Sequence, residues 1–141
     1  MLTVFGTEEL RMLWASVVLG LVQLTLAILA GIASGRLSWN LGARDQEGPP
    51  LGKIAGRVER ALQNYLQTFP LFATAVLLTS ILNRHNATTA LGASLYFYAR
   101  AAHVVIYALG IPVLRTLIWT VSIAGIVLIL LGIWPGNLFA R

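Results

Sequence analysis

The sequence predicts an all-α membrane protein whose four transmembrane helices form a single up-down bundle. The first observation is composition: of 141 residues, 57% are hydrophobic and 11% are charged, less than half of the roughly 25% charged residues usual in soluble domains. The second is a mean hydropathy of +0.79. The third is that the apolar residues fall into four long runs, each near the roughly 20 residues that a helix needs to cross a bilayer. We expect residues 1–141 to form one membrane domain.

The first predicted span covers residues 12–34, an apolar run that Gln23 interrupts. Glu8 and Glu9 precede it, where a signal peptide would carry basic residues, and the run is longer than a signal peptide needs. We therefore interpret it as a membrane span. Residues 35–56 follow as a polar loop with a Pro-Pro break.

The second predicted span covers residues 57–82, polar in its first half and apolar from Phe69 onward. A short polar turn separates it from the third span, residues 88–109. The fourth span, residues 113–133, ends before a Trp-Pro-Gly sequence. Because the connections on either side of the third span are short, we expect consecutive helices to be antiparallel neighbours.

Lysine and arginine are unevenly distributed between the two predicted sides of the membrane. The side that holds the loop 35–56 carries Arg36, Arg44, Lys53, Arg57 and Arg60. The opposite side carries Arg11, Arg84 and Arg141. Because cytoplasmic loops are enriched in these residues, we expect the loop in the cytoplasm and both termini outside.

The net charge of +5 and the absence of cysteine narrow the function classes. In so apolar a chain we interpret the positive charge as a determinant of orientation and of anion binding, and we expect no nucleic-acid partner. Zero Cys excludes disulfides, thiolate metal sites and cysteine nucleophiles. We expect no metal site.

Several polar residues lie within the predicted spans at helical spacing. They are Arg60, Asn64 and Gln67 in the second span, Arg100, His103 and Tyr107 in the third, and Arg115 at the start of the fourth. The predicted topology brings them to a similar depth in the cytoplasmic half of the bundle. Charges at this depth cost a few kcal/mol each and mark functional sites.

The five acidic residues lie outside the predicted spans or at their ends. The buried arginines therefore lack acidic partners, and the sequence predicts a cavity that receives an anion through charge-assisted hydrogen bonds. Simpler interpretations exist for single residues: Arg60 could extend to lipid headgroups, His103 could join two helices by a hydrogen bond, and Trp119 could be a packing aromatic. The conjunction of these residues favours the anion site.

Two segments resemble the signatures of a known family. Residues 59–70, ERALQNYLQTFP, resemble the E-R-x-x-x-N-x-x-E-x-x-P signature of MAPEG proteins (membrane-associated proteins in eicosanoid and glutathione metabolism). Arg100, His103 and Tyr107, with the later Arg115, are similar to its second signature, R-x-x-H-x-x-x-Y followed by Arg. Residues 42–45, GARD, resemble the G-N-R-D loop of the family's uncharacterised bacterial branch.

This resemblance implies a homotrimer in the membrane lipids, here a bacterial inner membrane, that binds glutathione as co-substrate between adjacent subunits and faces the cytosol. A lipophilic small-molecule substrate would arrive from the lipid. The residues implied to bind glutathione are Arg60, Asn64, Gln67, Arg100, His103 and Tyr107, with Arg36 from the neighbouring subunit and Thr116 as a hydroxyl donor. Arg115 would be the catalytic residue that stabilises the thiolate.

One residue departs from the first signature, because Gln67 stands where the family has Glu. Glutamine keeps the hydrogen bonding but lacks the charge, so we expect weaker or altered binding of the thiol ligand. Two functions stay open: a membrane glutathione transferase or peroxidase, and a non-catalytic lipid- or lipophile-binding protein on the same scaffold.

Overall fold

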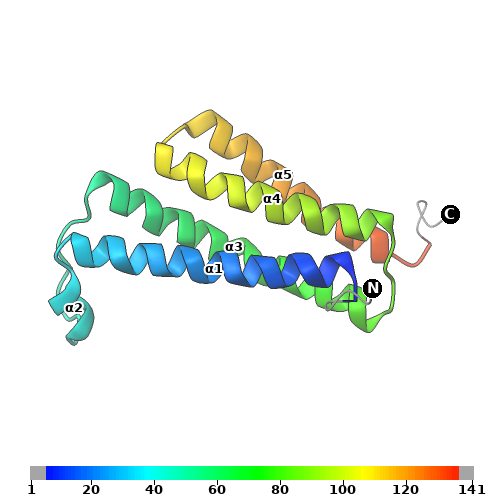
Figure 1. Ribbon diagram of the computed structural model, residues 1–141, viewed down its shortest axis with the longest axis horizontal. Coiled ribbons are helices and arrows are strands. Elements are labelled where there is room, and N and C mark those ends of the chain that lie inside the picture. The colour runs from blue at the N-terminus through cyan, green and yellow to red at the C-terminus, as the bar shows by residue number, and fades with distance from the viewer. Residues whose placement is uncertain (1–5, 137–141) are drawn as a thin grey trace.

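The chain is all-helical in a computed structural model that describes residues 6–136, and those residues contain no strand. The helices are α1 (Glu8–Ala33), α2 (Leu37–Leu41), α3 (Lys53–Ile81), α4 (Ala87–Leu109) and α5 (Pro112–Ile133). The four long helices run antiparallel to one another in chain order, with α2 beyond the end of α1 (Figure 1). The predicted helical class is confirmed. Arg141, used above in the orientation argument, lies outside the described residues.

The segment predicted as a polar loop, residues 35–56, is partly helical. It contains α2, and α3 begins at Lys53, four residues before the predicted start. The short helix is held by contacts between Trp39 and the chain that follows it: Trp39 Nε1 donates to the Gln46 carbonyl at 2.7 Å, and the Arg44 guanidinium lies 5.2 Å from the Trp39 ring centroid. The sequence hid this helix because it has only five residues and is followed by residues 42–48, whose Gly and charged residues favour a loop.

Local sequence sets the boundary of each helix around the short turns. Asn86 caps α4 by accepting from the backbone N–H groups of Thr88 and Thr89. Gly110 ends the same helix at φ +77°, a left-handed conformation that glycine adopts without strain. Pro112 then occupies the first turn of α5, where its missing N–H has no helical partner to lose. The resulting turn reverses the chain within two residues.

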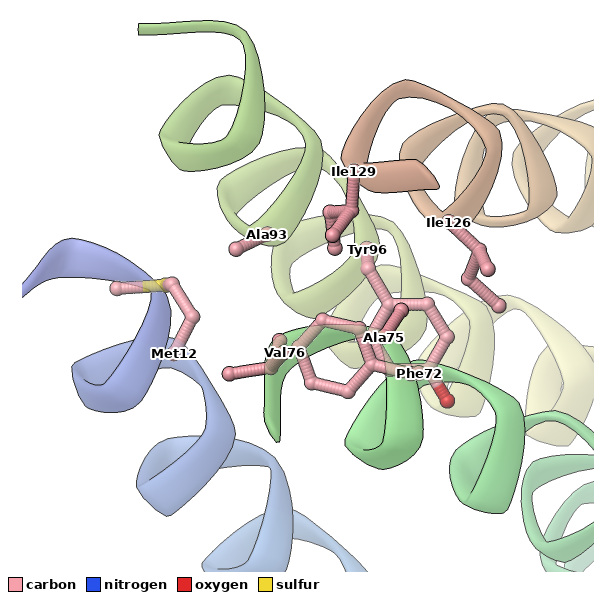
Figure 2. Close-up of a cluster of buried hydrophobic side chains, with 8 residues drawn as sticks. All are labelled: Met12, Phe72, Ala75, Val76, Ala93, Tyr96, Ile126 and Ile129. Atoms are coloured by element: carbon pink, nitrogen blue, oxygen red, sulfur yellow. The ribbon is translucent and has the colours of Figure 1, made fainter. Parts of the chain in front are cut away.

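The core lies where α1, α3, α4 and α5 meet, and aromatic stacking holds its centre. The rings of Phe72 and Tyr96 are 3.9 Å apart and nearly parallel. Met12 reaches them from α1, and Ile129 from α5 (Figure 2). All four side chains are buried, so one core joins α1, α3, α4 and α5.

Close contact between α4 and α5 depends on small residues. A Cβ added at Gly92 would lie 2.5 Å from the Gly125 carbonyl oxygen, and one at Gly125 would lie 2.6 Å from that of Gly92. A third glycine, Gly132, faces Thr89. Small residues at such positions allow helix backbones to approach closely, which is the usual packing of helices in membranes.

Helix α1 buries its polar face and exposes its apolar one. Glu9, Ser16 and Gln23 are buried, whereas neighbours such as Leu21 and Leu29 are more than half exposed. This pattern is the reverse of a surface helix in water. Among the described residues, α1 and α5 are the two helices that are long and apolar enough to cross a membrane. The four-span arrangement and the trimer stay predictions.

The two acidic residues placed ahead of the first span belong to α1. Glu8 and Glu9 form its first turn, where negative charge is favourable at the positive end of the helix dipole. Glu9 is 2% exposed; it accepts a hydrogen bond from Thr89 Oγ1 and lies 3.3 Å from His85 Nδ1. Because these partners come from the neighbouring turn and helix, the apolar run alone did not reveal them.

Candidate functional site

A cavity of about 230 Å³ opens between α3, α4 and α5, near the turn that joins α4 to α5. We call it the basic cavity. Its lining consists of Asn64, His103, Tyr107, Arg115, Thr116 and Trp119. Five of these six residues were predicted as site residues from the sequence.

Arg115 is positioned by the tight turn at Gly110. Because the chain reverses there, the first turn of α5 lies beside the last turns of α4, and the Arg115 guanidinium lies 4.8 Å from the centroid of the Tyr107 ring. A cation over an aromatic face at this distance is attracted to it. The neighbouring Thr116 donates its hydroxyl hydrogen to the Pro112 carbonyl at 3.1 Å. The guanidinium is thus held at the cavity wall.

Arg100 lies behind the cavity and fixes Asn64. Its side chain is 1% exposed, and Nη1 donates to Asn64 Oδ1 at 2.9 Å. Asn64 also lines the cavity, and with Oδ1 accepting from Arg100 its NH₂ group stays available as a donor. Arg100 also lies 5.3 Å from the Tyr65 ring centroid, while its Nε and Nη2 are buried without hydrogen-bond partners.

Two further side chains at the cavity have a buried ring nitrogen without a hydrogen-bond partner. His103 is 2% exposed, its ring centroid lies 5.4 Å from that of Tyr107, and its Nδ1 has no hydrogen-bond partner. Trp119 Nε1 is also buried without a partner. An unpaired buried polar group costs about 1–3 kcal/mol, so a ligand that forms hydrogen bonds with these nitrogens would recover that free energy.

The basic cavity contains no carboxylate. Within residues 6–136, the carboxylates in ion pairs within 4.0 Å belong to Glu8, Glu9 and Glu59, and none of them pairs with Arg100 or Arg115. The described part of the chain also has no group of three or more metal-ligating side chains. The set of donors around one cationic group suits an anion.

Two predicted site residues lie in a different pocket. Arg36 and Arg60 line a hollow of about 450 Å³ at the start of α3, which we call the loop pocket. Arg36 donates from Nε to the Pro49 carbonyl at 2.6 Å, and its Nη1 lies 3.7 Å from Glu59 Oε2. Within the described subunit, Arg60 therefore does not share one carboxylate-free cavity with Arg100 and Arg115, because Glu59 lines the same pocket as Arg60. The binding role of Arg36 toward a neighbouring subunit stays a prediction.

Gln67, the remaining predicted residue, is exposed and lines neither the basic cavity nor the loop pocket. The structure thus brings Asn64, Arg100, His103, Tyr107, Arg115 and Thr116 together, and leaves Arg36, Arg60 and Gln67 outside.

Sequence reasoning missed Trp119, which it interpreted as a packing aromatic. Trp119 lies four residues after Arg115, one helical turn along α5, so both side chains share a face. That spacing was the available signal.

Comparison with known proteins gives one match. A model described as the MAPEG family matches residues 12–134, a range that includes the basic cavity and the loop pocket. Searches of curated proteins and of solved structures found no match.

Proposed function

Because the chain belongs to the MAPEG family, we propose that it is a glutathione transferase- or peroxidase-like membrane protein. In this proposal the basic cavity binds the thiol end of glutathione and presents the thiolate to lipophilic electrophiles. The observation that carries the proposal is the cavity itself: Arg115, His103 and Trp119 line one space, the last two have a ring nitrogen without a hydrogen-bond partner, and no carboxylate of the described residues lines it.

Arg115 is the group that we assign to thiolate stabilisation. The thiol of a cysteine residue, such as that of glutathione, has a pKa of about 8.5, and an adjacent cation lowers this pKa by about one unit or more. Each unit corresponds to about 1.4 kcal/mol. Because the guanidinium is already held over Tyr107, its charge is in place before the substrate binds, which is the condition for efficient electrostatic stabilisation.

The rest of the tripeptide needs more space than the cavity provides. About 230 Å³ is below the roughly 300–1,000 Å³ of usual small-molecule sites. We propose that glutathione extends along α3 past Arg60 and Gln67, and that Arg36 of an adjacent subunit in a homotrimer binds one of its carboxylates. The exposed position of Gln67 and Arg60 on α3 supports this path.

In the conjugation step, the thiolate sulfur attacks an electrophilic carbon of a lipophile that arrives from the bilayer. A sulfur–carbon bond forms, and the leaving group departs with its electron pair. The thiol proton passes to solvent when the thiolate forms, since Arg115 stays charged throughout. We place the chain across a bacterial inner membrane, with termini outside and the loop 35–56 in the cytoplasm, where glutathione would bind.

The Arg115→Ala variant tests the proposal through the ultraviolet absorbance of the bound thiolate. We expect the wild type to gain thiolate absorbance on addition of glutathione at neutral pH and the variant to lose it. Arg84→Ala is the matched control, because Arg84 is exposed at the other end of the bundle and donates to the Ile133 carbonyl at 3.0 Å. Unchanged thiolate absorbance in Arg115→Ala would remove the assigned role.

A non-catalytic function is the second candidate, and Gln67 favours it. Gln67 lacks the negative charge with which the family's Glu would help to hold the ammonium group of glutathione. The donors of the basic cavity would equally bind the headgroup of an anionic lipid. Mass spectrometry of the protein purified in mild detergent separates the two. Retained glutathione supports the transferase, and retained anionic lipid supports the lipid-binding protein.

A further inference from the structure

A third pocket lies on the other side of α3 and α4 from the basic cavity, against α1. Its volume is about 280 Å³. Its lining consists of Gln23 and Leu26 of α1, Val58 of α3, and Val104, Val105, Ala108 and Leu109 of α4. We call it the Gln23 pocket. It shares no lining residue with the basic cavity.

Gln23 is the one polar side chain in this lining. It is 2% exposed, and both its Oε1 and its Nε2 are buried without a hydrogen-bond partner in the described chain. Leaving one such group unpaired costs about 1–3 kcal/mol. A primary amide with both ends unpaired therefore marks a place where a donor and an acceptor are missing together.

Water is a poor partner for this amide. A buried water molecule needs two to four polar partners, and every other side chain that lines the pocket is aliphatic. A ligand with a single polar end and an apolar body matches both the amide and the walls. The polar end must donate to Oε1 and accept from Nε2, which a hydroxyl group does.

The pocket is accessible from the side on which α1 and α4 expose apolar residues. Leu26 is 45% exposed, Val105 60% and Leu109 65%. These residues form an apolar rim, and in a bilayer an apolar ligand would reach Gln23 past them without crossing a charged surface.

We propose that the Gln23 pocket is a binding site for a single-chain lipophile with a terminal hydroxyl, a long-chain alcohol, whose hydroxyl pairs with the Gln23 amide and whose chain lies along Leu26 and Val105. The site is independent of the glutathione proposal, since no residue that lines the basic cavity lines this pocket. Its test therefore contains no glutathione.

The experiment uses two photoreactive probes that differ in one group. The full chain in phosphatidylcholine nanodiscs is irradiated with decanol, or with decane, each carrying the same diazirine in its chain, and the labelled peptides are mapped by mass spectrometry. We expect decanol to label α1 around Leu26 and α4 around Val105 at least about tenfold more than decane does, because two hydrogen bonds distinguish the probes.

Three variants complete the test. Gln23→Leu should reduce decanol labelling to the level of decane, and Ala108→Phe, which fills the pocket, should remove labelling by both probes at these sites. Thr25→Leu is the matched control, since exposed Thr25 donates to the Leu21 carbonyl and lines no part of the pocket; it should leave the labelling unchanged.

Equal labelling by decanol and decane in the wild type would overturn the proposal, and so would unchanged decanol labelling in Gln23→Leu. The comparison of probes on the wild type decides the matter even where a variant fails to fold.

Discussion

The hydrogen bond between Arg100 and Asn64 predicts a strong and measurable coupling. Arg100 is 1% exposed, and its Nη1 lies 2.9 Å from Asn64 Oδ1. In Asn64→Leu the guanidinium would stay buried without its one hydrogen-bond acceptor in the described chain. Hydrogen bonds to charged groups contribute about 1.5–3 kcal/mol, so we expect the free energy of unfolding to fall by about 2 kcal/mol.

The partner variant Arg100→Met removes the buried charge while keeping an unbranched chain. It leaves Asn64 beside the cavity, where water can pair with its amide, so we expect a loss of less than about 1 kcal/mol. The free energy of unfolding of the double variant should be close to that of Arg100→Met alone, because without Arg100 the Asn64→Leu substitution leaves no buried charge unpaired. The cycle therefore predicts a coupling of about 2 kcal/mol, within the range found for residues in contact.

Thermal unfolding in detergent, followed by far-ultraviolet circular dichroism, measures this coupling. A loss of about 2 kcal/mol should lower the melting temperature by about 6 °C in a chain of this size. The control is Arg84→Met, which removes an exposed arginine from the opposite end of the bundle. If the effects of Asn64→Leu and Arg100→Met add within about 0.5 kcal/mol, the two side chains act independently and the reasoning fails.

Gly125→Ala should destabilise the chain by about 1–3 kcal/mol, because its Cβ would lie 2.6 Å from the Gly92 carbonyl oxygen; a melting temperature equal to the wild type would contradict the close packing of α4 on α5. Gly110→Ala should destabilise the α4–α5 turn and displace Arg57, whose Cζ lies 2.6 Å from the added Cβ at a φ of +77°; unchanged thermal unfolding would refute this. Gln67→Glu should tighten glutathione binding in calorimetry by restoring the charge of the family signature, and an unchanged affinity would show that the charge is irrelevant here.

The sequence was sufficient to predict the long helices because their signal is additive. Each apolar run carries many residues, so a single polar residue such as Gln23 changes the sum little. Helix ends were harder: α2 has only five residues, and it and the first turn of α3 flank residues 42–50, whose Gly, Pro and charged residues favour a loop. Their helical form comes from contacts, such as Trp39 with the Gln46 carbonyl, that no local pattern encodes.

The grouping of Asn64 with His103, Tyr107 and Arg115 followed from helical spacing and antiparallel order. The same spacing predicted that Arg60 and Gln67 would lie with them, but neither residue lines the basic cavity. The helix geometry explains the difference. At about 100° per residue, Arg60 and Gln67 lie roughly 20° apart around α3, whereas Asn64 lies about 40–60° from each. The basic cavity lies on the Asn64 side, so residues on one helical stripe face different surroundings.

The partners of Glu9 and the pocket at Gln23 depend on contacts between helices, which the order of residues along the chain does not give. Thr89 is 80 residues from Glu9 along the chain, and its hydroxyl is identified as a partner only when α1 and α4 are packed together. Gln23 was visible as the one polar interruption of its span, yet the sequence alone does not reveal that its amide lacks a partner.

A structure of the chain solved with glutathione in a lipid nanodisc would locate the glutathione sulfur, and the role assigned to Arg115 depends on that position. We expect the sulfur in the basic cavity, within about 4 Å of the Arg115 guanidinium and beside His103 and Tyr107. A lipid headgroup in that cavity, or a sulfur held in the loop pocket away from Arg115, would contradict it.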